Sequence, residues 1–158
     1  MSQNSSIHQF PQPPIALALA AALTLGAVLW AAALLAAPTQ QTTLSAAVYR
    51  LASLICHQRP ERSFSLEGRQ LPVCARCAGL YFSGAIAAIA AWGPRRRSPK
   101  RSRELLLLAA LPTVATIPIE WLGVSALSNP IRFAAAWPFG AAAGWTFVRS
   151  LRSEGVEL

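Results

Sequence analysis

Three cysteines and one histidine are the residues of this sequence whose types and spacing best suit chemistry. Cys74 and Cys77 stand three positions apart, and Cys56 and His57 are neighbours in the chain. Cys74 and Cys77 open an apolar run, so they should share one face at the start of a helix. A helix N-terminus favours the thiolate, which is both a metal ligand and a redox nucleophile. The spacing alone therefore leaves two kinds of chemistry open.

The first kind of chemistry is metal binding by Cys56, His57, Cys74 and Cys77, with Glu120 as another candidate for the fourth ligand. Two cysteines separated by two residues bind one metal ion well, whereas adjacent ligands such as Cys56 and His57 are awkward around a single ion. Three thiolates favour soft-accepting ions over magnesium or calcium. We expect a zinc or iron site.

The second kind is thiol–disulfide exchange, in which Cys74 and Cys77 form the exchanging pair and Cys56 resolves or relays. An odd number of thiols is poorly suited to a purely structural disulfide framework. A third interpretation gives the cysteines no chemistry at all, because free cysteine often behaves as a small buried apolar side chain.

A group of charged residues lies in the segments around the cysteines. Guanidinium groups recognise phosphate and carboxylate with forked hydrogen bonds, which predicts binding of an anionic lipid or metabolite. Glu120 falls within an apolar run, where an ionisable residue is costly and is a functional candidate, although a structural ion pair with Arg132 would also explain it. The site candidates of this group are Arg59, Arg62, Arg76, Glu120 and Arg132.

The elements that must position these residues are those of an all-α integral membrane protein. Hydrophobic residues make up 54% of the chain and charged residues 13%, against about 25% charged residues in soluble domains. Each long apolar run approaches the ~20 residues that cross a bilayer. We therefore predict a four-transmembrane-helix bundle within a single membrane domain, residues 15–151, between a disordered tail, 1–14, and a C-terminal tail, 152–158. The predicted spans are residues 15–37, 75–92, 104–122 and 131–149.

A short amphipathic helix is predicted over residues 43–56, with Thr42 or Thr43 as its N-cap. It is too short and too polar to span the membrane, so it should lie at the interface or pack on the bundle. A polar Cys/Arg loop, 56–77, should follow it. The apolar positions that recur at helical spacing are Leu44, Ala47, Val48, Leu51, Leu54 and Ile55.

The net charge of +8 indicates membrane orientation and lipid contact rather than nucleic-acid binding. The basic run 95–103 should be cytoplasmic, although anionic lipid binding would also explain it. Both termini would then be cytoplasmic, and the cysteine loop would lie outside the cytoplasmic (inner) membrane. Gly140 and Gly144 form a small-xxx-small pair that allows close helix approach and offers a route to an oligomer. No protein partner is predicted.

Two stretches, Cys56 to Phe64 and Pro72 to Tyr81, resemble domain of unknown function 2085, an uncharacterised prokaryotic membrane protein family. That family pairs Cys-His…Pro-x-Arg-Ser-Phe with Cys-x-Arg-Cys-x-Gly-x-Tyr. The segment Pro118 to Arg132 is also similar, except that Glu120 stands where aspartate is more usual. The resemblance covers roughly residues 46–140 and implies a polytopic membrane protein, but no activity. It also implies that the cysteines, Arg62, Arg76, Glu120 and Arg132 form one site.

Overall fold

The computed structural model describes residues 14–94, 102–123 and 126–153, and this part of the chain is mostly helical. It contains five α-helices, two short 3-10 helices and one two-stranded sheet. The sheet corrects the predicted all-α class. The elements in chain order are α1 (Pro14–Ala36), η1 (Ala37–Thr39), α2 (Thr43–Ser53), η2 (Pro60–Arg62), β1 (Ser63–Leu66), β2 (Arg69–Cys74), α3 (Ala75–Ala90), α4 (Ser102–Trp121) and α5 (Asn129–Ser153).

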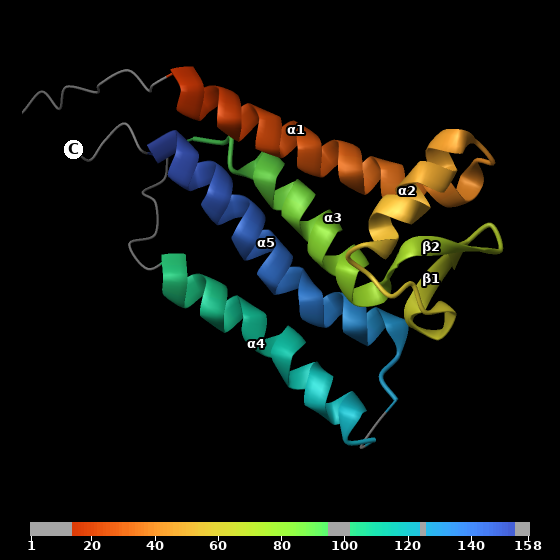
Figure 1. Ribbon diagram of the computed structural model, residues 1–158. Coiled ribbons are helices and arrows are strands. Elements are labelled where there is room, and N and C mark those ends of the chain that lie inside the picture. The colour runs from red at the N-terminus through yellow and green to blue at the C-terminus, as the bar shows by residue number, and fades with distance from the viewer. Residues whose placement is uncertain (1–13, 95–101, 124–125, 154–158) are drawn as a thin grey trace, which may run out of the picture.

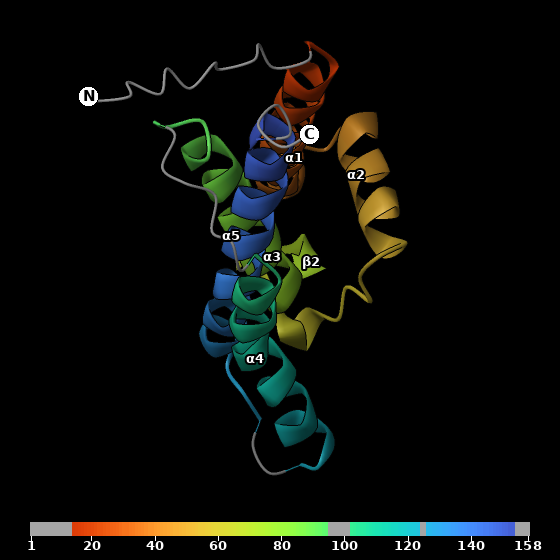
Figure 2. The same cartoon turned by 90° about the vertical axis from the view of Figure 1, so that its left-hand side faces the viewer.

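Helices α1, α3, α4 and α5 run alternately up and down, and each corresponds to one predicted span (Figure 1). The start of α1 and the end of α5 lie at one end of the bundle. The hairpin β1–β2, α2 and the turn between α4 and α5 lie at the other end, and α2 stands to one side of the bundle, away from α4 (Figure 2). Among the described helices, α1 with η1 and α4 are long and apolar enough to cross a membrane, while α3 is apolar but shorter. Helix α5 carries Arg132, Arg149 and Arg152.

Apolar side chains cover the outside of the bundle. No described residue of helix α4 is buried as a whole, and most of its leucines are exposed. Such an exposed apolar surface is unfavourable in water and favourable in contact with lipid chains. The exposed large apolar residues of α1 and α4 include Leu17, Leu19, Leu25, Leu29, Leu107, Leu108, Leu111 and Val114.

Helices α3 and α5 form the closest pair of the bundle because glycines let their backbones meet. A Cβ on Gly140 would overlap the backbone oxygen of Leu80, and one on Gly144 would overlap that of Gly84. The expected close approach by Gly140 and Gly144 therefore occurs, but inside the chain. This corrects the prediction that the pair offers a route to an oligomer, since both glycines are already in use.

Helix α2 begins as predicted, because the Thr42 side chain accepts a hydrogen bond from the backbone N–H of Ser45 at 3.2 Å. The face it buries differs from the predicted apolar face. Ser45, Val48 and Ala52 are buried, and the Ser45 hydroxyl donates to the Ala37 carbonyl at 2.6 Å. Small residues fit close to η1 and β2, where leucines would not. The exposed apolar residues around this helix are Leu44, Leu51, Leu54 and Ile55.

The segment predicted as the polar loop 56–77 contains the hairpin. Strands β1 and β2 pair antiparallel, with Leu66 opposite Arg69. Glu67 and Gly68 join them with φ of 52° and 75°, as a tight two-residue hairpin turn requires. The hairpin was not predicted because its strands are too short for a clear alternating pattern and because prolines at positions 60 and 72 are typical of a loop.

Several predicted segments lie wholly or partly outside the described residues. They are residues 1–13 of the predicted N-terminal tail, residues 95–101 of the basic run and residues 154–158 of the C-terminal tail. Pro14 is already the first residue of α1, and α5 continues to Ser153, so the predicted N-terminal tail overlaps a helix by one residue and the predicted C-terminal tail by two.

Candidate metal centre

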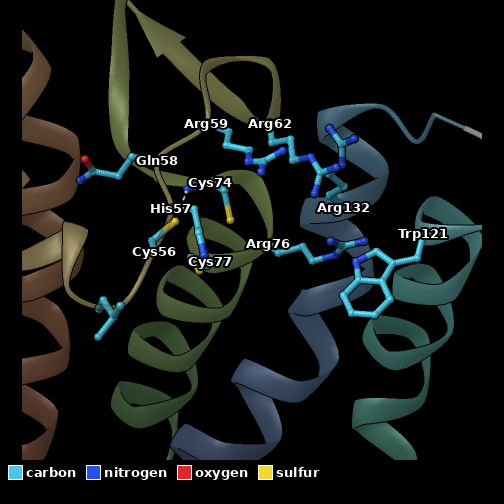
Figure 3. A pocket seen from close by; sticks show the side chains of 11 residues that line it. Cys56, His57, Gln58, Arg59, Arg62, Cys74, Arg76, Cys77, Trp121 and Arg132 are labelled. Atoms are coloured by element: carbon cyan, nitrogen blue, oxygen red, sulfur yellow. Dashed lines mark hydrogen bonds between the residues drawn. The ribbon is translucent and has the colours of Figure 1, made fainter. Parts of the chain in front are cut away.

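The three cysteines come together at one end of the bundle although Cys56 is far from the other two in sequence. Their Sγ atoms all lie within 4.8 Å of one another (Figure 3). Cys56 follows α2, and its backbone N–H donates to the Ala52 carbonyl at 2.9 Å. Cys74 ends β2 and is the N-cap of α3, and Cys77 lies in the first turn of that helix. The three cysteines of the predicted site therefore lie close together.

The hairpin is what brings these cysteines together. It leaves α2 and returns beside it, so that the end of β2 arrives next to Cys56. The backbone N–H of Cys74 then donates to the Cys56 Sγ at 3.1 Å. All three cysteines are free thiols, with Cys56 buried and the other two half-buried.

The Cys74 thiol is strongly acidic for a cysteine. A hydrogen bond from the Cys77 thiol, followed in size by backbone N–H groups of the first turn of α3 and the Cys56 thiol, lowers the Cys74 pKa to about 5 against the opposing effect of burial. Helix N-termini favour thiolates for the same reason. Cys74 is therefore a thiolate at neutral pH, the form that binds metal or attacks a disulfide.

This donor set fits a soft or borderline metal ion. Tetrahedral zinc with sulfur at ~2.3 Å separates its sulfur ligands by about 3.8 Å. The three sulfurs need only a small rearrangement to reach that spacing, which the half-buried Cys74 and Cys77 side chains permit. Three of the four ligands of an ion could thus come from Cys56, Cys74 and Cys77. The fourth ligand would come from a group close to these thiols.

The two sequence candidates for a fourth ligand lie in different places. His57 is exposed and lines the cavity beside the thiols, but its ring nitrogens are not among the ligand atoms that lie within 4.8 Å of one another. Glu120 is bound to two arginines instead. A bound ion would therefore meet His57 or a group from the cavity at its fourth position.

Glu120 joins α4 to α3 and α5 through a buried ion-pair network. Its side chain is only 5% exposed; Oε2 accepts from Arg76 at 2.8 Å and Oε1 accepts from Arg132 at 2.6 Å. The predicted Glu120–Arg132 pair is therefore present, and Arg76 is added to it. Arg76 also donates to the carbonyl and hydroxyl oxygens of Thr116 at 3.2 Å, and Arg132 donates to the Asn129 side chain at 2.7 Å.

A cavity of about 420 Å³ connects the thiols with the arginines. The sulfurs and His57 lie on one side of it, and four guanidinium groups lie on the other (Figure 3). The two predicted groups of site residues thus share one hollow, and Glu120 lies behind its wall. The residues that line it are Ile55, Cys56, His57, Gln58, Arg59, Arg62, Cys74, Arg76, Cys77, Trp121 and Arg132.

Sequence reasoning missed the residues that hold this site in place. The Gln58 side chain donates to the carbonyls of Tyr49 at 2.8 Å and Pro72 at 2.7 Å, which ties the Cys56 segment to both α2 and β2. The Asn129 side chain donates to the Ser63 carbonyl at 3.0 Å and ties α5 to the hairpin. Gln58 and Asn129 both lie in the stretches that resemble the known family, which was the available signal.

The fold and site define a small helical membrane protein with a three-cysteine cluster at one end of its helices. Residues 56–146 match the family described as "Predicted membrane protein (DUF2085)", and the chain belongs to that family. A relative, an uncharacterized protein of Methanothermobacter thermautotrophicus, is 33% identical over 86 residues, which are 54% of this chain and 78% of the relative. Uncharacterized protein MJ1492 of Methanocaldococcus jannaschii is 31% identical over 107 residues, 66% of each chain. No solved structure matches.

Proposed function

We propose that this protein binds one zinc or iron ion through Cys56, Cys74 and Cys77 at one membrane face. The observation that carries the proposal is the approach of three Sγ atoms to within 4.8 Å of one another. Three convergent thiols are more than a disulfide requires, and they form a ligand set that suits these ions. The ion's fourth position would face the cavity, where His57 or a bound ligand could complete it.

The proposed membrane arrangement places α1, α3, α4 and α5 across the bilayer as one domain, residues 15–151. Their apolar outer surface and the length of α1 and α4 support it. The basic residues of the run 95–103, which joins α3 to α4 in the sequence, would be cytoplasmic. Both termini would then face the cytoplasm, and the thiols would face outward from the inner membrane.

Thiol–disulfide exchange is the second candidate, and the acidity of Cys74 favours it. A thiolate with a pKa of about 5 is typical of exchanging cysteines. Cys74 would attack a disulfide of a partner, form a mixed disulfide and release one partner thiolate. The thiol of Cys77 or Cys56, once deprotonated, would then attack the Cys74 sulfur, form a disulfide within this chain and release the second partner thiolate. Two electrons would pass from the two thiols of this chain to the partner, which would leave as a dithiol.

Elemental analysis of the detergent-purified protein separates the two candidates. The metal proposal expects about one zinc or iron per chain, and loss of that metal in a Cys74→Ser/Cys77→Ser variant. Metal well below one per chain, with no change in the variant, would refute it. A redox-sensitive gel shift of the wild type alone, without metal, would assign the protein to thiol exchange instead.

A further inference from the structure

The arginine side of the cavity is a second feature of the site, separate from the thiols. Arg59 and Arg62 come from the segment before β1, Arg76 comes from α3, and Arg132 comes from α5. Elements far apart in the sequence thus direct four guanidinium groups toward one hollow (Figure 3). A metal site made of thiolates does not require them.

Positive charge on this side exceeds the negative charge that could balance it. The described lining residues include four arginines and no aspartate or glutamate, and the Cys74 thiolate supplies one negative charge on the opposite side. Glu120 neutralises one charge behind Arg76 and Arg132. Glu61 lies 4.0 Å from Arg59, but both side chains are largely exposed, so solvent weakens this contact. The balance favours an anionic occupant.

Arg76 and Arg132 are held in place before any ligand arrives. Glu120 fixes both guanidinium groups from behind, which reduces the entropy lost on binding. The Nε–H of Arg76 is buried and has no hydrogen-bond partner among the described residues. A buried donor without a partner is costly, so a rotation of the Arg76 guanidinium that let a ligand oxygen in the cavity reach this N–H would be favourable.

Two of the exposed residues that line the cavity are apolar. Trp121 is 85% exposed and Ile55 is 57% exposed, and both line the cavity at the end of the bundle. Exposed tryptophan is typical of the headgroup level of a bilayer. The cavity therefore offers both guanidinium groups and exposed apolar contacts.

We propose that the arginine side of this cavity binds a phosphate group, carried by an anionic phospholipid or by a soluble phosphate ester. Arginine forks match the tetrahedral oxygens of phosphate, and the surplus charge suits a group with one or two negative charges. The phosphate would lie among Arg59, Arg62 and Arg76, beside the thiols. This binding goes beyond the proposed metal site and does not depend on it.

Calorimetric titration of the full chain in an uncharged, phosphate-free detergent tests the proposal with three probes: inorganic phosphate, glycerol phosphate and dihexanoyl phosphatidic acid. At least one should bind, and Arg59→Gln and Arg62→Gln should each weaken it about tenfold. Arg59 is 60% exposed, so its substitution should leave the fold intact. Arg69→Gln removes an exposed arginine outside the cavity as the matched control.

The probes also identify the source of the phosphate. Tighter binding of phosphatidic acid would indicate a lipid headgroup, and equal binding of glycerol phosphate would indicate a soluble ester. No binding of any probe, or equal weakening by Arg69→Gln, would overturn the proposal. Titration of the Cys74→Ser/Cys77→Ser variant separates this result from the metal proposal, because phosphate should still bind to a protein that has lost its metal.

Discussion

The backbone N–H of Cys74 donates a hydrogen bond of 3.1 Å to the Sγ of Cys56. This contact joins the start of α3 to the end of α2 across the whole hairpin. The contact holds the Cys56 sulfur beside those of Cys74 and Cys77, within 4.8 Å of both. This hydrogen bond makes Cys56 part of the thiol cluster rather than a separate buried side chain, so its loss should affect metal binding.

Cys56→Ser should lose most of the bound metal, whereas His57→Ala should retain about one ion per chain. Cys56 supplies one of three convergent sulfurs, and the His57 ring lies outside that group. Serine keeps the size and polarity of the side chain but is a poor ligand for soft ions. Elemental analysis of the two purified variants checks the prediction. Equal loss of metal in both variants would show that His57 is an essential ligand.

Alkylation of Cys74 in the metal-free protein should depend unusually little on pH near neutrality. Since its pKa is lowered to about 5, the thiolate persists at neutral pH, and its reaction with iodoacetamide should slow only as the pH falls through that value. An ordinary thiol has a pKa of about 8.5 and would already react slowly at pH 7. Mass spectrometry of the labelled peptides gives the rate at Cys74, with denatured protein as the control. A midpoint above pH 8 in the folded protein would contradict the prediction.

Glu120→Gln should destabilise the protein by about 3–5 kcal/mol, because it leaves buried guanidinium groups without their counter-charge. The side chains of Glu120 and Arg132 are 5% and 9% exposed. Unfolding in mixed detergent micelles measures the loss of free energy. Glu67→Gln at the exposed hairpin turn is the control and should have little effect. An equally small change in the free energy of unfolding for Glu120→Gln would contradict the prediction, because the ion-pair network would then contribute little to stability.

Gly144→Ala should destabilise the α3–α5 pair by about 1–3 kcal/mol, the usual cost of an overpacked contact. A Cβ there would overlap the backbone oxygen of Gly84, and neither backbone can yield without separating the helices. Gly26→Ala in α1 is a matched control, since its Cβ would meet nothing within 4 Å. Because alanine is the better helix former, the control should be neutral or slightly stabilising. Equal unfolding free energies for the two variants would contradict the predicted close packing.

Local signals in the sequence predicted most of the helices. Apolar runs predicted α1, α3, α4 and α5. A helix pairs its backbone N–H and C=O groups within its own segment, so an apolar run of sufficient length is stable as a helix in lipid. Thr42 marked the start of α2 because a cap is made within one turn. The i, i+3 spacing placed Cys74 and Cys77 together at the start of α3 for the same local reason.

The sequence alone determined the apolar helices, the start of α2 and the pairing of Cys74 with Cys77, all of which depend on neighbours along the chain. Only the tertiary structure decided which face of α2 is buried, that Gly144 contacts α3 and that Arg76 joins the Glu120 ion pair. It also brought Cys56 to the other thiols, through a hairpin whose short strands carry little pattern. These features depend on packing and hydrogen bonds between segments that are far apart in the sequence. Such contacts contribute free energy only in the folded chain, so no local sequence pattern predicts them.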